Sequence, residues 1–311
     1  MGKSSVIRLF VAAAGMAGLL SADSSSVDSP LIGYVVRPAG PAGSSKVPEL
    51  RAMLGVPGAA RFSDAMPLPK GTRTAEAAPG LTWILCNRTS GAAAFEPASL
   101  TLTPLPVSGM PSSWAFSPTG ARVALYFADR GEVALISGLP SSPALDSTVK
   151  VAPFDSFAAG DNGGFVYTSG NRVFTSSGQL LYKASGTLGP VAYETGRDAV
   201  VLYDGGSLME AGLTGSATPR SLAAGLTACD QMFASVDKIY ASDSKAGTLS
   251  IVNYADGSVA SQNVHVTRIV PSAVVGTVVV SLEAAEPAWL VNAQGVSFVP
   301  AVLGSRVAES Q

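Results

Sequence analysis

A chain of 311 residues is long enough for one large domain or two small ones. Hydrophobic residues make up 47% of it and charged residues only 14%, which excludes a disordered protein, because disordered chains are poor in aliphatic residues. The 33 glycines and 21 prolines favour short strands and tight turns over helices, which need charged residues on their solvent face. The net charge of −2 leaves no electrostatic footprint for DNA or RNA, so we expect no nucleic-acid partner.

The first residues have the features of a signal peptide. Lys3 and Arg8 form a positively charged start, and residues 9–20 form an apolar run of about a dozen residues, too short to span a bilayer as a helix. We therefore expect residues 1–22 to be removed on export and residues 23–30 to be a short linker. The mature protein should be secreted or periplasmic, without a membrane span. Retention of the first segment as an N-terminal anchor is the alternative.

A strand–turn–strand pattern recurs along the rest of the chain, and its clearest copy is WAFSPTGARVALYFADRGEVALIS at residues 114–137. This copy predicts strands at residues 114–117, 122–128 and 132–137, because Gly and Asp supply the backbone angles of the tight turns between them. The second of these strands has six counterparts. The seven copies begin at Leu31, Leu81, Arg122, Gly164, Asp198, Lys238 and Gly276. Their spacing of roughly 34 to 50 residues matches the length of a four-stranded propeller blade, about 40–50 residues.

These second strands are apolar on both faces. Val123, Leu125 and Phe127 lie on one side of their strand, and Tyr126 lies on the other side between two alanines. A sheet with one face in water would alternate apolar and polar residues. The connections are too short, and too rich in Gly, Ser and Pro, to hold covering helices, whereas blades stacked face to face cover one another. We therefore expect Val123, Leu125 and Phe127 to pack against one neighbouring blade and Tyr126 against the other.

The predicted fold is all-β, a single β-propeller domain over residues 31–311 with seven four-stranded antiparallel blades. Residues 55–79 show little strand pattern within it. A propeller usually closes its ring by pairing its N-terminal and C-terminal strands in one blade, which removes an exposed edge. If residues 31–36 completed the blade that begins near Arg268, the number of blades would be six.

The segment AFSPTGARVALY, residues 115–126, resembles the repeat of WD40-like and TolB-like propellers, which often carry a Phe-Ser-Pro-Asp-Gly turn. Thr119 stands where that turn has its aspartate. The close match covers one repeat, and no Trp-Asp dipeptide occurs in the chain. The resemblance implies a propeller fold. Because such propellers are mostly interaction platforms, it also implies a binding role.

No motif for catalysis or for a cofactor stands out. His265 is the single histidine, which excludes a His-rich metal site and a pair of histidines for acid–base work. Three segments rich in Asp and Gly lack the alternating acids of a calcium loop, so we predict hairpin turns for them. They are Asp161-Asn162-Gly163-Gly164, Asp204-Gly205-Gly206 and Asp256-Gly257. We expect no cofactor and no bound metal.

Cys86 and Cys229 are the two cysteines of the chain. The strand copies that begin at Arg122, Gly164 and Asp198 lie between them, so their blades cannot be neighbours in a ring of seven. A disulfide needs Cα atoms within about 7 Å of each other. Although export would permit a disulfide, we expect two free thiols shielded by packing.

The candidate binding residues come from the geometry of a propeller rather than from a motif. Loops that enter the innermost strands and loops that join second to third strands share one face around the channel mouth. That face should carry Asn87, Arg88, Trp114, Asp129, Arg130, Asp155, Asp230, Gln231, Ser244, Lys245 and Arg268. Mixed charge with an aromatic side chain suits a protein, a peptide or another polar ligand.

Two functions of different class follow. The first is an exported, monomeric, non-catalytic binding or assembly propeller that recognises its partner at the channel mouth. The alternative is a carboxylate-dependent enzyme, such as a glycoside hydrolase. Asp155 and Asp230 would enter different blades near the axis, and two carboxylates about 5–10 Å apart are enough for that chemistry.

Overall fold

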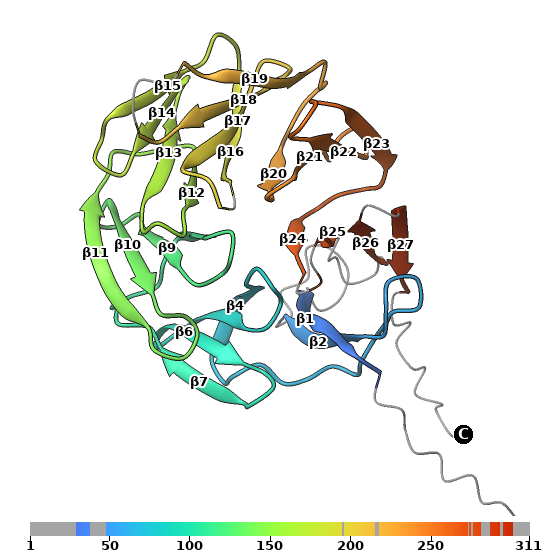
Figure 1. Ribbon diagram of the computed structural model, residues 1–311. Coiled ribbons are helices and arrows are strands. Elements are labelled where there is room, and N and C mark those ends of the chain that lie inside the picture. The colour runs from blue at the N-terminus through green and yellow to red at the C-terminus, as the bar shows by residue number, and fades with distance from the viewer. Residues whose placement is uncertain are drawn as a thin grey trace, which may run out of the picture.

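The computed structural model describes residues 29–37, 48–194, 196–214, 218–272, 274, 276–280, 287–292 and 295–300. This part of the chain contains strands and turns and no helix, and so none that could cross a membrane. Its strands form seven antiparallel sheets arranged as the blades of a propeller (Figure 1). The all-β, seven-bladed prediction is confirmed. The predicted signal peptide lies outside the described residues.

Each blade is a continuous stretch of sequence. Blade 1 has three described strands, β1 (Leu31–Arg37), β2 (Glu49–Leu54) and β3 (Arg61–Phe62). The other six blades have four strands each, paired in sequence order. Blade 2 consists of β4 (Thr72–Ala77), β5 (Ile84–Arg88), β6 (Gly91–Glu96) and β7 (Thr101–Pro104). Blade 3 consists of β8 (Ser113–Phe116), β9 (Val123–Phe127), β10 (Glu132–Ser137) and β11 (Ala144–Lys150).

The second half of the ring repeats this plan. Blade 4 consists of β12 (Ser156–Ala159), β13 (Phe165–Ser169), β14 (Arg172–Thr175) and β15 (Leu180–Lys183). Blade 5 consists of β16 (Leu188–Tyr193), β17 (Ala199–Asp204), β18 (Ser207–Gly212) and β19 (Arg220–Ala224). Blade 6 consists of β20 (Gln231–Ala234), β21 (Lys238–Asp243), β22 (Thr248–Asn253) and β23 (Val259–Asn263). Blade 7 consists of β24 (Ile269–Pro271), β25 (Val278–Val280), β26 (Ala288–Asn292) and β27 (Gly295–Val299).

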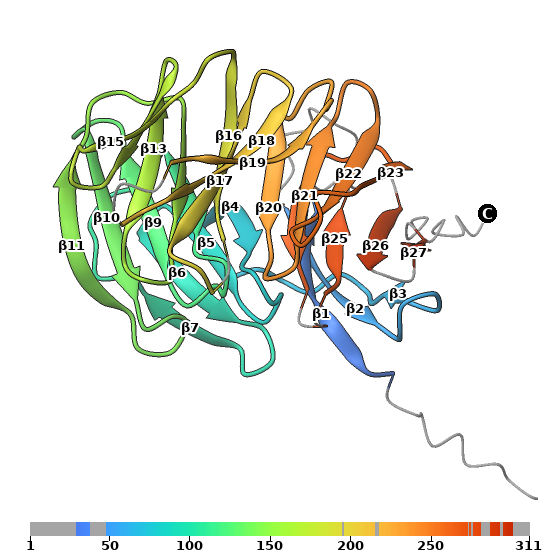
Figure 2. The same cartoon turned by 45° about the horizontal axis from the view of Figure 1, so that its top comes forward.

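The first strand of each blade lies nearest the centre, and the strands run between two faces of the ring (Figures 1 and 2). The connections into the first strands and the turns between second and third strands lie on one face, here called the entry face. The turns between first and second strands, and those between third and fourth strands, lie on the opposite face, the exit face. The candidate residues predicted from the sequence belong to the entry face.

Packing between blades follows the prediction for blade 3. Val123, Leu125 and Phe127 are buried in one apolar cluster with residues of blade 2, including Trp83. Tyr126 belongs to the cluster on the other side, which contains side chains of blade 4. Strand alternation therefore sends successive side chains of β9 to opposite neighbours, which explains why a second strand is apolar on both faces.

The first predicted strand copy, at Leu31, requires a correction. The other six copies became second strands, but β1 is the first strand of its blade and pairs with β2 from Arg37 opposite Glu49 to Leu31 opposite Leu54. It does not pair with blade 7. The six-blade alternative is therefore wrong, because β1 and the last blade belong to separate sheets.

The ring closes by packing and by single hydrogen bonds instead of a shared sheet. Ile32 and Val35 of β1 lie in one apolar cluster with residues of blades 2 and 7. The backbone N–H of Tyr34 donates to Leu81 O at 2.7 Å, and that of Gly80 donates to Pro271 O at 3.0 Å. Blade 1 approaches blade 2 very closely, since a Cβ on Gly33 would lie 2.4 Å from the Cβ of Leu81.

Cys86 and Cys229 are both free and buried. Cys86 lies in β5 of blade 2, and Cys229 lies just before β20 of blade 6. These blades are not neighbours in the ring, in agreement with the expectation from the sequence.

Candidate functional site

Several of the predicted entry-face residues donate side-chain hydrogen bonds to the backbone of neighbouring connections. Arg88 donates from Nη2 to Lys70 O at 2.9 Å, and the Asn87 side-chain amide donates to Pro111 O at 3.3 Å. The guanidinium of Arg130 lies 4.0 Å from the centre of the Phe127 ring. Its Nη2 donates to Ser108 O at 3.2 Å. Arg88 thus holds the connection between blades 1 and 2, and Asn87 and Arg130 hold the connection between blades 2 and 3.

The two carboxylates considered for catalysis each cap a hairpin turn of their own blade. Asp155 Oδ2 accepts from the backbone N–H of Gly170 at 2.8 Å, in the turn between β13 and β14. Asp230 Oδ2 accepts from the backbone N–H of Ser244 at 2.9 Å, and its Oδ1 accepts from the Ser242 hydroxyl at 2.7 Å. Burial alone would raise the pKa of Asp230, but the hydrogen bonds, led by that from the Ser244 hydroxyl, lower it overall. Both groups therefore have a structural role within the blade.

Trp114 and Arg268 are brought together by a residue that the sequence did not single out. Glu76, in β4, accepts from Trp114 Nε1 at 2.5 Å through one oxygen and pairs with Arg268 Nη2 at 2.5 Å through the other. These residues come from blades 2, 3 and 7. The cluster therefore joins blades 2, 3 and 7 in the part of the ring that no shared sheet closes. Glu76 was missed because it belongs to the segment with little strand pattern.

The remaining candidates, Asp129 and Lys245, are exposed in hairpin turns of blades 3 and 6. Gln231 donates its side-chain amide to Thr267 O, and thus links the connections into β20 and β24. Most of the predicted entry-face residues therefore already have partners within the protein.

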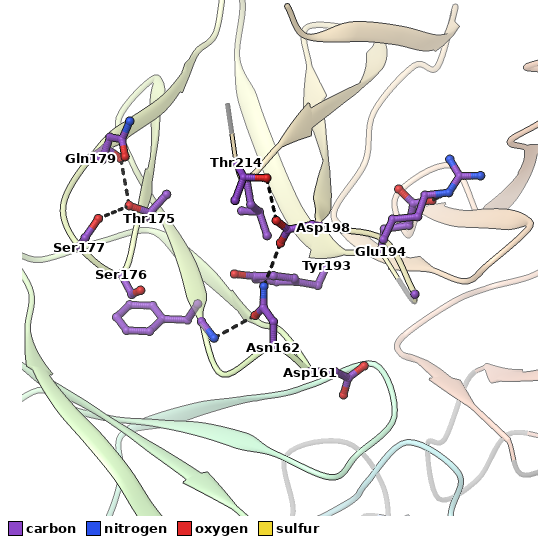
Figure 3. Close-up of a pocket in the computed structure, with 15 residues that line it drawn as sticks. Asp161, Asn162, Thr175, Ser176, Ser177, Gln179, Tyr193, Glu194, Asp198 and Thr214 are labelled. Atoms are coloured by element: carbon purple, nitrogen blue, oxygen red, sulfur yellow. Dashed lines mark hydrogen bonds and ion pairs between the residues drawn. The ribbon is translucent and has the colours of Figure 1, made fainter. Parts of the chain in front are cut away.

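A cavity lies on the exit face, between blades 4 and 5 (Figure 3). Its volume is about 630 Å³. Blade 4 forms one wall, with Asp161, Asn162, Gly164, Phe165, Thr175, Ser176, Ser177 and Gln179. Blade 5 forms the other, with Tyr193, Glu194, Gly196, Arg197, Asp198, Leu213 and Thr214. This is within the range of about 300–1,000 Å³ that is typical of small-molecule sites.

Asp198 occupies the centre of this cavity and joins its two walls (Figure 3). Its Oδ1 accepts from Asn162 Nδ2 of blade 4 at 3.0 Å, and its Oδ2 accepts from the Thr214 hydroxyl of blade 5 at 2.9 Å. Asn162 is held in turn, because its Oδ1 accepts from the backbone N–H of Gly164 at 3.0 Å. The carboxylate is exposed and keeps unused acceptor capacity, since each oxygen can accept more than one hydrogen bond.

Tyr193 forms the aromatic wall of the cavity. It is only 6% exposed, and no described residue hydrogen-bonds its hydroxyl. The ring fits against Gly160, where a Cβ would come within 2.3 Å of a ring carbon, so a glycine is needed there for space rather than for its backbone angles. Burial, and then the nearby Asp198 carboxylate, raise the pKa of Tyr193, which keeps the hydroxyl a donor.

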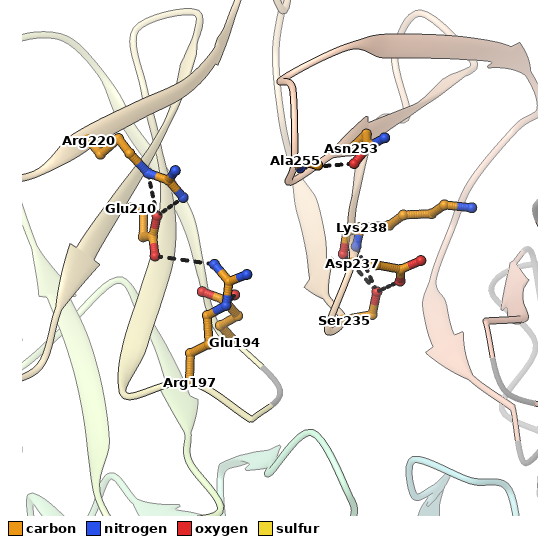
Figure 4. A network of polar contacts seen from close by, with 9 residues as sticks. All are labelled: Glu194, Arg197, Glu210, Arg220, Ser235, Asp237, Lys238, Asn253 and Ala255. Atoms are coloured by element: carbon orange, nitrogen blue, oxygen red, sulfur yellow. Dashed lines mark hydrogen bonds and ion pairs between the residues drawn. The ribbon is translucent and has the colours of Figure 1, made fainter.

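The residue after Tyr193 belongs to the neighbouring junction, between blades 5 and 6 (Figure 4). The Glu194 side chain is fully buried and lies 2.8 Å from Arg197 Nε. Arg197 also approaches Glu210 at 3.8 Å, and Arg220 Nε donates to Glu210 at 2.8 Å. Burial raises the pKa of Glu194, Arg197 lowers it, and Glu210 raises it again, with a net increase.

The three predicted Asp-Gly turns are confirmed as turns. Residues 204–206 connect β17 to β18, and residues 256–257 connect β22 to β23. The segment 161–164 connects β12 to β13, and it also forms the rim of the cavity. The sequence indicated the turn but not the cavity, because the remaining walls come from distant segments. Among the described residues there is no group of three or more His, Cys, Asp or Glu that could hold a metal ion.

No family model and no curated protein matches the chain. It is similar in fold to a putative 6-phosphogluconolactonase from Bacteroides fragilis, with a TM-score of 0.56 at 12% identity over 89% of this chain and 96% of that one. PorZ, a surface component of the type-IX secretion system of Porphyromonas gingivalis, gives a TM-score of 0.54 at 12% identity, over 88% of this chain but 39% of that chain. Virginiamycin B lyase from Staphylococcus aureus gives 0.50 at 10% identity, over 71% and 80%. Likeness at these identities shows the propeller fold alone.

Proposed function

We propose that the protein is an exported, monomeric, non-catalytic binding propeller that holds a polar ligand in the cavity between blades 4 and 5. The observation that carries this proposal is the cavity itself, in which Asp198, Asn162 and Thr214 form a hydrogen-bonded group beside the Tyr193 ring. A concave site with a few convergent polar groups on an aromatic wall is the usual form of a small-molecule site.

The exit face is favoured over the entry face that the sequence predicted. On the entry face, Arg88, Arg130 and Trp114 bind other parts of the protein. These side chains would lose those contacts on turning to a ligand, whereas Asp198 can accept a further hydrogen bond and keep those from Asn162 and Thr214. Among the predicted entry-face residues, Asp129 and Lys245 are exposed charges that a protein or peptide partner could reach.

The carboxylate-dependent enzyme has less support. Asp155 and Asp230, the two groups that it required, are engaged in the turns of blades 4 and 6. These hydrogen bonds direct each carboxylate to the hairpin turn of its own blade. We therefore retain binding, not hydrolysis, as the proposed activity.

Binding is tested with the chain lacking residues 1–22, by isothermal titration calorimetry against neutral oligosaccharides, acidic oligosaccharides and short cationic peptides. At least one class should bind saturably, and Asn162→Ala should weaken it, because the carboxylate would lose its contact from blade 4. The matched control is Asn171→Ala, in an exposed turn of blade 4 on the entry face. No binding by any class, or equal binding by both variants, would overturn the proposal. Loss of bound compound to hydrolysis would favour the enzyme.

Export is tested separately by N-terminal sequencing of protein recovered from outside the cytoplasm. The positively charged start and short apolar run predict a mature protein that begins near Asp23. Soluble cytoplasmic protein with an intact Met1 would contradict the proposal of export and leave the binding test unaffected.

A further inference from the structure

We infer, on the basis of the proposed binding function, that the ligand of the cavity between blades 4 and 5 is a neutral saccharide. The carrying observation is the combination of one central carboxylate, a surrounding set of neutral hydroxyl and amide groups, and an aromatic wall whose hydroxyl is unpartnered among the described residues.

The charges around the cavity disfavour an anionic ligand. Arg197 is the cation of the described lining, and it pairs with Glu194 at 2.8 Å and approaches Glu210 at 3.8 Å. Figure 3 shows Glu194 on the side of β16 away from the cavity centre. A phosphate or carboxylate ligand would therefore meet Asp198 without a free cation to offset the repulsion.

A cationic ligand is also disfavoured, because the acidic groups near the cavity do not act together. Asp161 accepts from the Thr119 hydroxyl of blade 3, so its carboxylate is directed toward that blade. Glu194 is neutralised by Arg197. Only Asp198 remains at the centre, and it already accepts hydrogen bonds from two neutral donors. Because Asp198 is exposed, solvent would screen an ion pair between its carboxylate and a cationic ligand, and that pair would contribute little to binding.

The neutral side chains of the cavity match sugar hydroxyl groups, which both donate and accept. Six residues supply hydroxyl or amide groups that can do the same. They are Asn162, Thr175, Ser176, Ser177, Gln179 and Thr214. The Thr175 and Ser177 hydroxyls lie 2.8 Å apart, so a pair of adjacent hydroxyls is presented on the wall opposite Asp198 (Figure 3).

The aromatic wall suits the other part of a sugar, its ring of C–H groups. Tyr193 and Leu213 line the cavity, and the Phe165 ring that borders it is almost fully buried. The face of an aromatic ring is negatively polarised, so it attracts the weakly positive C–H groups of a pyranose ring. The Tyr193 hydroxyl adds a donor close to Asp198, and a sugar hydroxyl bound between the two would satisfy both. A cavity of about 630 Å³ has room for a short oligosaccharide.

Two variants test the ligand class, each with a matched control. Asp198→Asn keeps the shape of the side chain but removes the charge, and Tyr193→Phe keeps the ring but removes the hydroxyl. Neutral oligosaccharides of several linkage types are titrated calorimetrically, alongside uronic-acid oligosaccharides and lysine-rich peptides. We expect one neutral series to bind, with a loss of about tenfold or more in Asp198→Asn and a smaller loss in Tyr193→Phe, because a hydrogen bond to a charged group is the stronger one.

The controls are Asp129→Asn, on an exposed turn of the entry face, and Tyr34→Phe, in blade 1; both should bind as the unchanged protein does. Urea denaturation of each variant confirms folding. If lysine-rich peptides or uronic acids bind instead, and Asp198→Asn abolishes that binding, the saccharide inference is wrong while the binding function stands. Neutral-sugar binding unaffected by both cavity variants would also overturn the inference. If no class binds, both proposals fail.

Discussion

Tyr193 is the last residue of β16 and Glu194 follows it, and their side chains lie on opposite sides of blade 5 (Figures 3 and 4). Tyr193 lines the open cavity shared with blade 4, whereas Glu194 lies in the junction with blade 6 beside Arg197. The junction with blade 4 holds an open cavity lined by hydroxyl groups. At the junction with blade 6, ion pairs within blade 5 lie beside Tyr254, whose ring Arg197 contacts. The two junctions share one strand, so the difference arises from which side chains alternate along it.

Beneath these exit-face ends, the two junctions are alike. Val200 and Leu202 of β17 are buried in the apolar cluster shared with blade 4. Val201 and Tyr203, the alternate residues, are buried in the cluster shared with blade 6. These two apolar clusters, here called the floors of the junctions, hold the blades together. The residues at the exit-face ends of the strands can therefore differ between the two junctions. The apolar residues that hold blades 4 and 5 together are thus largely distinct from the polar residues of the proposed binding cavity, and Tyr193 belongs to both sets.

The largest effect should come from the floor of the open junction. Leu202→Ala removes a side chain that is fully buried between blades 4 and 5, and it should lower the free energy of unfolding by about 2–5 kcal/mol. Urea denaturation measures this loss. Thr214→Ala, at the exposed end of the same junction, should cost less than about 1 kcal/mol. Equal losses in the two variants would contradict this distinction between the apolar and the polar residues of the junction.

A smaller effect is expected where the floor meets the cavity. Gly160→Ala introduces a Cβ that would lie 2.3 Å and 2.6 Å from two carbons of the Tyr193 ring, so the ring must move. Overpacking of this kind costs about 1–3 kcal/mol, and the displaced ring should also weaken ligand binding. Gly164→Ala is the graded control, because its Cβ would stay 3.2 Å from the Tyr193 hydroxyl. A thermal melt and a binding titration of both variants check the order.

The junction between blades 5 and 6 should make the free energy of unfolding depend on pH, because it contains Glu194. The pKa of Glu194 is raised in the folded protein above its ordinary value of 4.5 by burial, with Arg197 opposing and Glu210 adding to the increase. The folded state therefore retains a proton that the unfolded state loses, and stability should fall as pH rises above that ordinary value. The Glu194→Gln variant has no carboxyl group to titrate at this position, so it should not show this fall in stability. The difference in unfolding free energy between the variant and the unchanged protein should therefore shift in favour of the variant as pH rises.

Denaturant titrations at a series of pH values measure that difference directly. The groups that face Glu194 are Arg197 of its own blade and Tyr254 of blade 6, with Glu210 and Arg220 farther out. Asp129→Asn provides the background, since Asp129 is exposed on the entry face. A difference between Glu194→Gln and the unchanged protein that stays constant with pH would show that Glu194 does not titrate in this way.

The smallest expected effect concerns the cysteines. Burial is the main cause that raises the pKa of the Cys86 thiol to about 11 and that of Cys229 to about 12. Because the thiolate is the reactive form, neither should react with iodoacetamide at neutral pH in the native protein, and both should react in urea. Mass spectrometry counts the labels. Rapid native labelling of Cys229 would show that the floor between blades 5 and 6 opens easily.

Blade 3 shows how far local pattern predicts structure. Its first three strands were predicted within about one residue at each end, and Tyr126 and Phe127 pack against opposite neighbours as expected. Strands that are apolar on both faces can only be buried on both faces, so the pattern is sufficient. Blade 1 shows the limit. The strand at Leu31 has the same composition as a second strand, but its position in the sheet depends on its partners.

The sequence by itself determined the all-β fold, the repeating blade pattern and the separation of the two cysteines, because these depend on the order and spacing of local apolar segments. The choice between six and seven blades came from the strand pairing. Only the tertiary structure decided which polar side chains are engaged in hydrogen bonds within the protein and which can reach a ligand. The sequence suggested Asp155 and Asp230 as catalytic carboxylates. Each accepts a hydrogen bond from the backbone of a turn that lies beside it only after the blade has folded. The cavity arises from side chains of two blades and from the fit of the Tyr193 ring against Gly160. No local pattern records which junction will be left open, because that depends on how the side chains of neighbouring blades meet.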